Sequence, residues 1–178
     1  MGIILSAFIG IGKEEIISTY GSNIKILDLD NKSMIDEVPP SNFVDDISSQ
    51  VGNYDIVFIP TAKFIREELE RRNIDYDLYY PSKERRQELI LKFVGSRIPF
   101  TDIATFDTNY NKYIDEIDSD ESPNCYKHKL SEDGHFLWND QVIIRYIQSV
   151  IENAKNNERM EESSRGEETD EENKTGDA

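Results

Sequence analysis

The strongest constraint on the fold lies at the start of the chain, where a short apolar run leads directly into glycines. The segment Gly2–Phe8 is almost entirely apolar, which suits a strand buried on both faces of a sheet. Gly10 and Gly12 follow, and the two acids and two isoleucines after Lys13 are typical of the first turns of a helix. This order predicts a central strand, a glycine loop and a helix.

The same alternation of strand and helix continues along the chain. Short apolar segments predict strands over residues 24–30, 54–59 and 76–80, and helical spacing of apolar residues predicts helices over residues 62–73, 82–94, 101–117 and 140–151. Such an order predicts an α/β fold, a three-layer sandwich around a mostly parallel sheet. We expect a functional site where the carboxyl ends of the strands meet.

Composition separates one domain from a tail. The chain has 178 residues, and nearly all its aromatic and branched aliphatic residues precede residue 152. We therefore predict one domain over residues 1–152 and an acidic, disordered tail over residues 153–178, since the tail can bury little apolar surface. The tail either keeps the protein in solution or binds a partner.

Charge and cysteine content exclude several classes of protein. The formal net charge is −16, from 20 Lys and Arg against 36 Asp and Glu, so generic binding to nucleic acid or anionic lipid is disfavoured. Cys125 is the single cysteine, and with two histidines it argues against a disulfide or a structural metal centre. With neither a membrane span nor a basic signal sequence, the chain is expected to be cytoplasmic and without a membrane partner.

The glycine loop fits a phosphate-binding pattern in all but one place. Its residues are Ala7, Phe8, Ile9, Gly10, Ile11, Gly12, Lys13 and Glu14. Glycines allow backbone N–H groups to surround a phosphate, and a lysine at the helix start adds positive charge. Glu14 stands where a magnesium-binding Ser or Thr is usual, and its negative charge would crowd a triphosphate. Alternatively, Gly10 and Gly12 serve only a tight strand-to-helix turn.

These residues, in this order, resemble the small P-loop nucleoside and nucleotide kinases, and more narrowly the P-loop kinase-like proteins encoded by bacteriophages. The resemblance covers about residues 1–150. The matching parts are residues 7–14, 27–30 with 40–43, 55–69, and 76–81 with the basic helix that follows. It implies a P-loop NTPase-like fold, ATP and Mg²⁺ as cofactors, and the host cytoplasm as the location of a phage protein.

The pair Asp28 and Asp30 gains a role from this resemblance. In similar kinases an Asp-x-Asp at the end of the second strand serves the metal and the acceptor hydroxyl. The resemblance therefore implies that Asp28, with Glu14, binds the metal and that Asp30 contacts the acceptor, both acids being catalytic together with Lys13. Alternatively, the two acids only cap a strand and begin a turn.

Basic residues are unusually dense in one stretch of this acidic chain: Arg66, Arg71, Arg72, Lys83, Arg85, Arg86, Lys92 and Arg97. The density predicts a positive patch. By the same resemblance, Lys63 and Arg66 contact the acceptor, and Arg85, Arg86 and Arg97 close over the transferred phosphoryl group as catalytic lid residues. Alternatively, these charges pair with acids on solvated helix faces.

The function expected from the sequence is an ATP-dependent phosphotransferase acting on a nucleotide or nucleoside-like acceptor, in the manner of a nucleoside monophosphate kinase. The alternative is a non-catalytic module that kept the fold and binds a nucleotide or a protein, which Glu14 favours. A kinase that acts on DNA bases is disfavoured by the net charge. The sequence leaves open whether the chain forms a homodimer.

Overall fold

The structure is a computed structural model that describes residues 2–30 and 39–172, with side chains through residue 160. The chain forms two units, Met1–Asp140 and Gln141–Ala178. The first unit is the α/β domain, and the second begins with helix α7. The boundary predicted after residue 152 falls within α7 (Gln141–Glu172).

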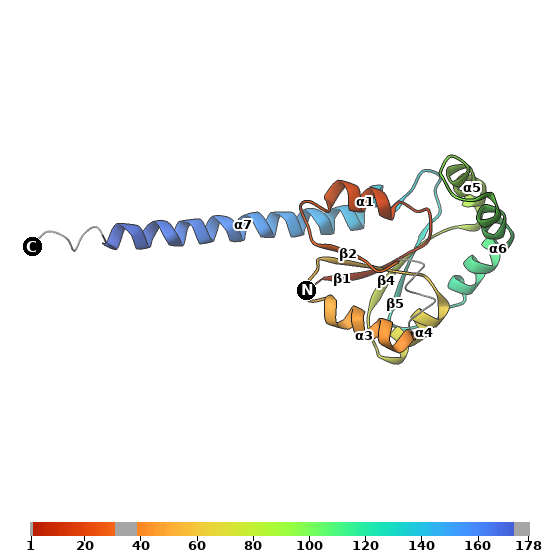
Figure 1. Ribbon diagram of the computed structural model, residues 1–178, viewed down its shortest axis with the longest axis horizontal. Coiled ribbons are helices and arrows are strands. Elements are labelled where there is room, and N and C mark those ends of the chain that lie inside the picture. Colours follow the sequence, from red (N-terminus) through yellow and green to blue (C-terminus); the bar gives the residue numbers. More distant parts are fainter. Residues whose placement is uncertain (1, 31–38, 173–178) are drawn as a thin grey trace, which may run out of the picture. The chain divides into compact units, whose positions relative to one another are not determined.

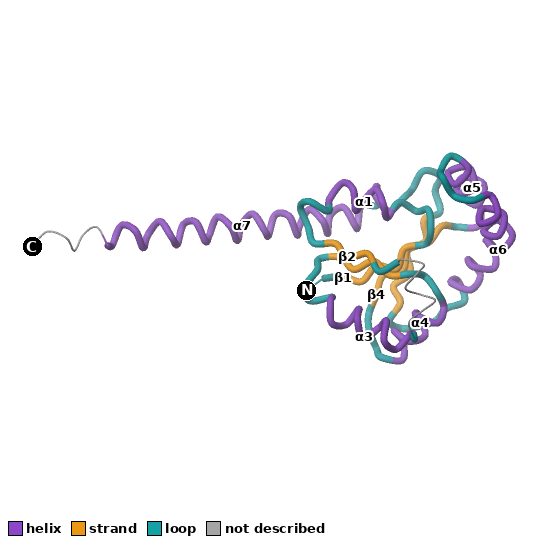
Figure 2. The backbone as a smooth tube through the Cα atoms, in the orientation of Figure 1, coloured by secondary structure: helices purple, strands orange, loops and turns teal. Residues whose placement is uncertain are grey.

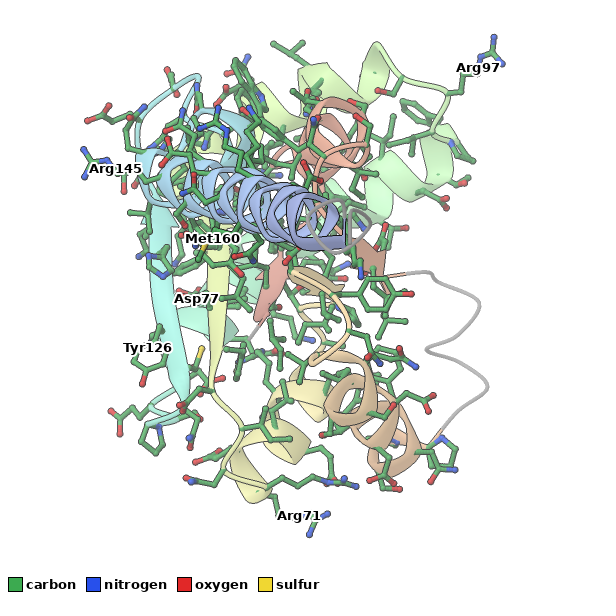
Figure 3. The ribbon with its side chains drawn as sticks, turned by 90° about the vertical axis from the view of Figure 1, so that its left-hand side faces the viewer. Arg71, Asp77, Arg97, Tyr126, Arg145 and Met160 are labelled. Carbon is green, nitrogen blue, oxygen red and sulfur yellow. The ribbon has the colours of Figure 1, made fainter. Side chains whose placement is uncertain are left out.

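The α/β domain is built on one parallel five-stranded sheet in the order β2-β3-β1-β4-β5. The strands are β1 (Ile3–Ala7), β2 (Ile26–Asp28), β3 (Ile56–Ile59), β4 (Tyr76–Pro81) and β5 (Cys125–Leu130). All four ladders are parallel, so the carboxyl ends of all five strands lie at one edge. Figure 3 shows Asp77 and Tyr126, which are register partners, on the neighbouring strands β4 and β5.

Burial follows position in the sheet. The inner strands β1 and β3 are apolar and almost fully buried, because both of their faces are covered. The edge strands β2 and β5 are more exposed, and β5 carries lysines at alternate positions. The loop after β1 therefore begins from the rigid centre of the domain.

Helices lie on both faces of this sheet. They are α1 (Lys13–Tyr20), α3 (Pro40–Gln50), α4 (Lys63–Arg71), α5 (Arg86–Val94) and α6 (Phe100–Asp118), with short 3₁₀ helices η1 (Lys83–Arg85) and η2 (Leu137–Asn139). In Figure 1, α1 lies on one side of the sheet, while α3 and α4 pack together on the other. Figure 2 shows the strands in orange between these purple helices. The α/β fold with a parallel sheet is therefore confirmed.

Two elements were missed from the sequence. Helix α3 begins at Pro40, in a part of the chain between residues 30 and 54 for which no helix was predicted, with proline in the first turn, where its missing N–H costs nothing. It buries Phe43, Val44 and Ile47. Strand β5 was missed because its lysines hide the apolar signal, whereas pairing along the whole of β4 stabilises it.

Helix α7 continues to Glu172, although the sequence predicted disorder from Asn153. The stretch is rich in glutamate, a good helix former, and helix propensity requires no burial. Residues 152–160 are exposed, as expected for a segment with little apolar surface. Residues 173–178 of the predicted tail lie outside the described residues. Of the helices in residues 2–30 and 39–172, none is both long enough and apolar enough to cross a membrane.

Candidate functional site

The loop between β1 and α1 is held in a conformation that requires its glycines. Gly10 and Gly12 have φ angles of 84° and 101°, in the left-handed region that favours glycine. A Cβ atom on Gly10 would lie 2.7 Å from the Phe93 ring, and one on Gly12 would lie 2.6 Å from Cδ1 of Trp138. Local packing thus demands both glycines whether or not a phosphate binds.

Lys13, the first residue of α1, is bound by two carboxylates from the end of β2. Its Nζ donates to Oδ1 of Asp28 at 3.1 Å and to Oδ2 of Asp30 at 2.9 Å. The Asp30 N–H also donates to Oδ1 of Asp28, at 3.0 Å. The structure therefore brings together three residues that the sequence placed at the same edge.

Burial and charge shift the pKa of two members of this cluster. Burial opposes the charge on Lys13, but hydrogen bonding to Asp30 and attraction to both aspartates hold its pKa above the usual value. Burial raises the pKa of Asp30 despite the hydrogen bond from Lys13, and the charges of Asp28 and Glu14 raise it further. Lys13 therefore carries a positive charge and is surrounded by carboxylates.

A cavity of about 520 Å³ opens beside Lys13, at the carboxyl edge of the sheet. Its apolar wall comes from Phe8, Phe64, Phe106 and Tyr113, and its charged groups are Lys13, Glu14, Asp30, Lys63 and Glu116. Phe64 on α4 is 40% exposed, and Tyr113 on α6 is 39% exposed. The cavity is large enough for a small-molecule ligand.

The two residues expected to contact an acceptor have different surroundings. Lys63 lines the cavity and forms a loose ion pair with Glu67, at 3.7 Å. Arg66 is only 2% exposed, and it donates to the Thr61 carbonyl and to the carboxylates of Glu116 and Asp120. Arg66 thus ties α4 to α6, and its guanidinium is already occupied.

The three expected lid arginines do not gather at the cavity. Arg85 is fully buried, pairs with Glu88 at 2.7 Å, and donates to the Leu130 and His135 carbonyls. Arg86 pairs with Asp107, and Arg97 is exposed in the middle of the loop between α5 and α6. The fully buried Arg85 therefore ties the start of α5 to the segment after β5, and the lid role of the three arginines stays a prediction.

The predicted positive patch is likewise not formed. Figure 3 shows Arg71 and Arg97 pointing outward at opposite ends of the domain. Arg71 and Arg72 both bind Glu68, and Lys92 pairs with Glu15. The basic residues are therefore divided among separate ion pairs. Arg71, Arg72 and Arg85 pair with acids three or four residues away, as helix-face pairing predicted, whereas Arg66, Lys83, Arg86 and Lys92 pair with acids of other elements.

Metal ligation was expected from Glu14 and Asp28. Within residues 2–30 and 39–160, no cluster of three or more His, Cys, Asp and Glu side chains could hold a metal ion. Magnesium, however, commonly takes one or two carboxylates and completes its shell with water and phosphate oxygens. The side chain of Asp28 is 37% exposed, so its free oxygen fits that mode of binding.

Sequence reasoning missed the aromatic residues that surround the loop. Trp138 is 44% exposed and stacks on Phe136 with a centroid separation of 6.3 Å. Lys92 lies over the Phe136 ring and donates to the Gly10 carbonyl at 3.1 Å. No local pattern links these residues to the loop, since they come from distant parts of the chain.

The fold and this site define an α/β protein with a lysine-bearing glycine loop beside an aromatic cavity. No protein-family model matches the chain, and no curated protein sequence is significantly similar to it.

Proposed function

We propose that the chain is an ATP-dependent phosphotransferase acting on a nucleotide or nucleoside-like acceptor. One observation carries this proposal: the Lys13 ammonium lies at the end of a glycine loop, between Asp28 and Asp30, and on the wall of an aromatic cavity. A donor phosphate at the loop and an acceptor in the cavity would then be neighbours.

The reaction would rely on position and charge. Lys13 would exchange its carboxylate partners for phosphate oxygens, and Asp30 would orient the acceptor hydroxyl. Asp28 would hold magnesium, which supplies charge neutralisation to the phosphates when bound. The acceptor oxygen forms a bond to the γ-phosphorus of ATP, the bond from that phosphorus to the β,γ-bridging oxygen breaks, and ADP leaves. The hydroxyl proton passes to solvent.

A transfer assay with labelled ATP, magnesium and a panel of nucleosides and nucleotides tests the proposal. Label should move to an acceptor with the wild-type chain and not with Lys13→Met. Lys112→Met is the matched control, because Lys112 is exposed on α6 and does not line the cavity. If the wild-type chain and Lys13→Met transfer label equally, or neither transfers any, the proposal fails.

A second candidate is a binding module without catalysis. The burial of Arg85 favours it, as does Glu14 in the place of a magnesium-binding hydroxyl. The substitution Glu14→Ser separates the two candidates. In an enzyme it should raise phosphoryl transfer, because it restores the usual ligand. In a binding module, Glu14→Gln should instead tighten nucleotide binding without magnesium, since a negative charge near the phosphates is removed.

A further inference from the structure

The cavity beside Lys13 presents aromatic surface from three directions. Phe8 and Phe106 are buried and pack with ring centroids 6.0 Å apart, while Phe64 and Tyr113 are partly open to solvent. Partly exposed aromatic side chains at a cavity gain by burying their surface against another ring. The apolar part of the cavity therefore suits a planar aromatic ligand.

The charges at this cavity are unbalanced toward acid. The described cations at or behind its wall are Lys13, Lys63 and Arg66. Each is already paired: Lys13 with Asp28 and Asp30, Lys63 with Glu67, and Arg66 with Glu116 and Asp120. Glu14 adds one more carboxylate to the lining. Six acids therefore surround these three cations, and three of the acids, Glu14, Asp30 and Glu116, line the cavity itself.

This excess of acids disfavours the binding of a phosphorylated acceptor. A monophosphate brings two negative charges into a cavity whose lining holds three acids, Glu14, Asp30 and Glu116, and two lysines. Sites that recognise a phosphate usually offer an unpaired arginine or a helix N-terminus at the phosphate position. The N-termini of α1 and α4 do reach this cavity, but α1 carries Glu14 and Glu15 in its first turn and Lys63 of α4 pairs with Glu67. Arg66, the arginine next to the cavity, has its three donor groups occupied by Thr61, Glu116 and Asp120.

We infer that the cavity takes an uncharged aromatic alcohol, of which a nucleoside is the natural representative, and discriminates against its 5′-monophosphate. This inference rests on the proposed function for the cavity's role as the acceptor site. It also gives a reason for release of product: the transferred phosphoryl group adds negative charge, and the same acids that admit the neutral acceptor repel the charged product.

Binding measured without ATP tests the inference separately from turnover. We would titrate the full chain with four common nucleosides and their matched 5′-monophosphates by isothermal calorimetry. At least one nucleoside should bind ten-fold or more tightly than its monophosphate. Equal or tighter binding of the monophosphates, or no binding of any nucleoside, overturns the inference.

Variants identify the cavity as the place of binding. Phe64→Ala and Tyr113→Ala should each weaken nucleoside binding at least five-fold, whereas Phe100→Ala, at an exposed site on α6 outside the cavity, should not. Glu14→Gln should reduce the ratio of nucleoside affinity to monophosphate affinity several-fold. Glu132→Gln, in the exposed loop after β5, should leave this ratio unchanged. If the cavity variants behave like their controls, the ligand binds elsewhere and the inference fails.

The two proposals can fail independently. Nucleoside binding without phosphoryl transfer would refute the phosphotransferase and leave the ligand class standing. Transfer that prefers a monophosphate acceptor would refute the ligand class and leave the phosphotransferase standing.

Discussion

Two cations in the domain are each held by two carboxylates, yet their surroundings differ. Lys13 binds Asp28 and Asp30 at the edge of the cavity, and the side chain of Asp28 remains 37% exposed. Arg66 binds Glu116 and Asp120 with almost no exposure, and it also donates to a backbone carbonyl. One cluster faces a space that a ligand can enter, and the other is closed.

The two clusters also differ in how easily their cations can exchange partners. The lysine ammonium is a compact charge, so it can exchange one hydrogen-bond acceptor for another with little rearrangement. The arginine guanidinium is planar, and once its N–H groups are bound to several acceptors its orientation is fixed. We therefore expect Lys13 to govern ligand binding and Arg66 to govern stability. Substitutions at these two positions test that division, and two further predictions concern clusters and segments of other kinds.

The largest effect is expected at Arg66. Arg66→Leu should lower the free energy of unfolding by about 3–5 kcal/mol, because it leaves Glu116 and Asp120 without their buried partner. Urea denaturation monitored by circular dichroism measures this change. Arg86→Leu, which breaks an exposed pair with Asp107, is the control and should leave stability nearly unchanged. Similar losses in the two variants would contradict the division.

A smaller effect on stability is expected at Lys13. Lys13→Met should cost about 1–2 kcal/mol, since it removes two charge-assisted hydrogen bonds but leaves carboxylates that water can reach. Millimolar Mg²⁺ should raise the melting temperature of Lys13→Met more than that of the wild-type chain, because a cation can then lie between the two acids. Equal responses to Mg²⁺ would show that Asp28 and Asp30 do not form a cation site.

Glu68 has the inverse arrangement, in which one carboxylate binds two arginines, Arg71 and Arg72. Its contribution to stability can be tested by changing the pH. Hydrogen bonds from Arg71 and then Arg72 lower the pKa of Glu68 to about 2. A lowered pKa stabilises the fold above the unfolded pKa of 4.5, and this contribution is lost as the pH falls toward 2. The stability difference between the wild-type chain and Glu68→Gln should therefore be largest above pH 5 and shrink below it. A difference that stays constant from pH 7 to pH 3 would refute this role of Glu68.

The smallest effect is expected in the C-terminal segment, whose described side chains, at residues 153–160, are exposed. Deleting residues 153–178 should change the free energy of unfolding by less than about 0.5 kcal/mol, since residues 153–160 are exposed. The far-ultraviolet circular dichroism should nevertheless lose helical signal, because α7 extends to Glu172. A loss of several kcal/mol would show that this segment contributes to folding.

The sequence predicted those parts of the molecule that depend on local pattern. Strands β1, β3 and β4 were visible as apolar runs, and parallel topology was enough to place Lys13 near Asp28 and Asp30. The phosphotransferase role assigned to these three residues stays a prediction. The sequence predicted only that these three residues lie close together.

The arginines could not be placed in this way, because their partners are distant in the sequence. Arg66 depends on two acids of the segment 116–120, and Arg85 depends on carbonyls at positions 130 and 135. A high local density of basic residues says nothing about which acids the fold will bring to them. Only tertiary structure distinguishes a free arginine from one that is already neutralised.

The packing around the glycine loop offers a second reason, besides ligand binding, for the presence of its two glycines. Phe93 and Trp138 leave no room for a side chain at Gly10 or Gly12. A side chain at either position would have to displace these rings, whether or not the loop binds a ligand. The two glycines are therefore explained by packing alone, and Lys13, Asp28 and Asp30 are the positions at which a binding function can be tested.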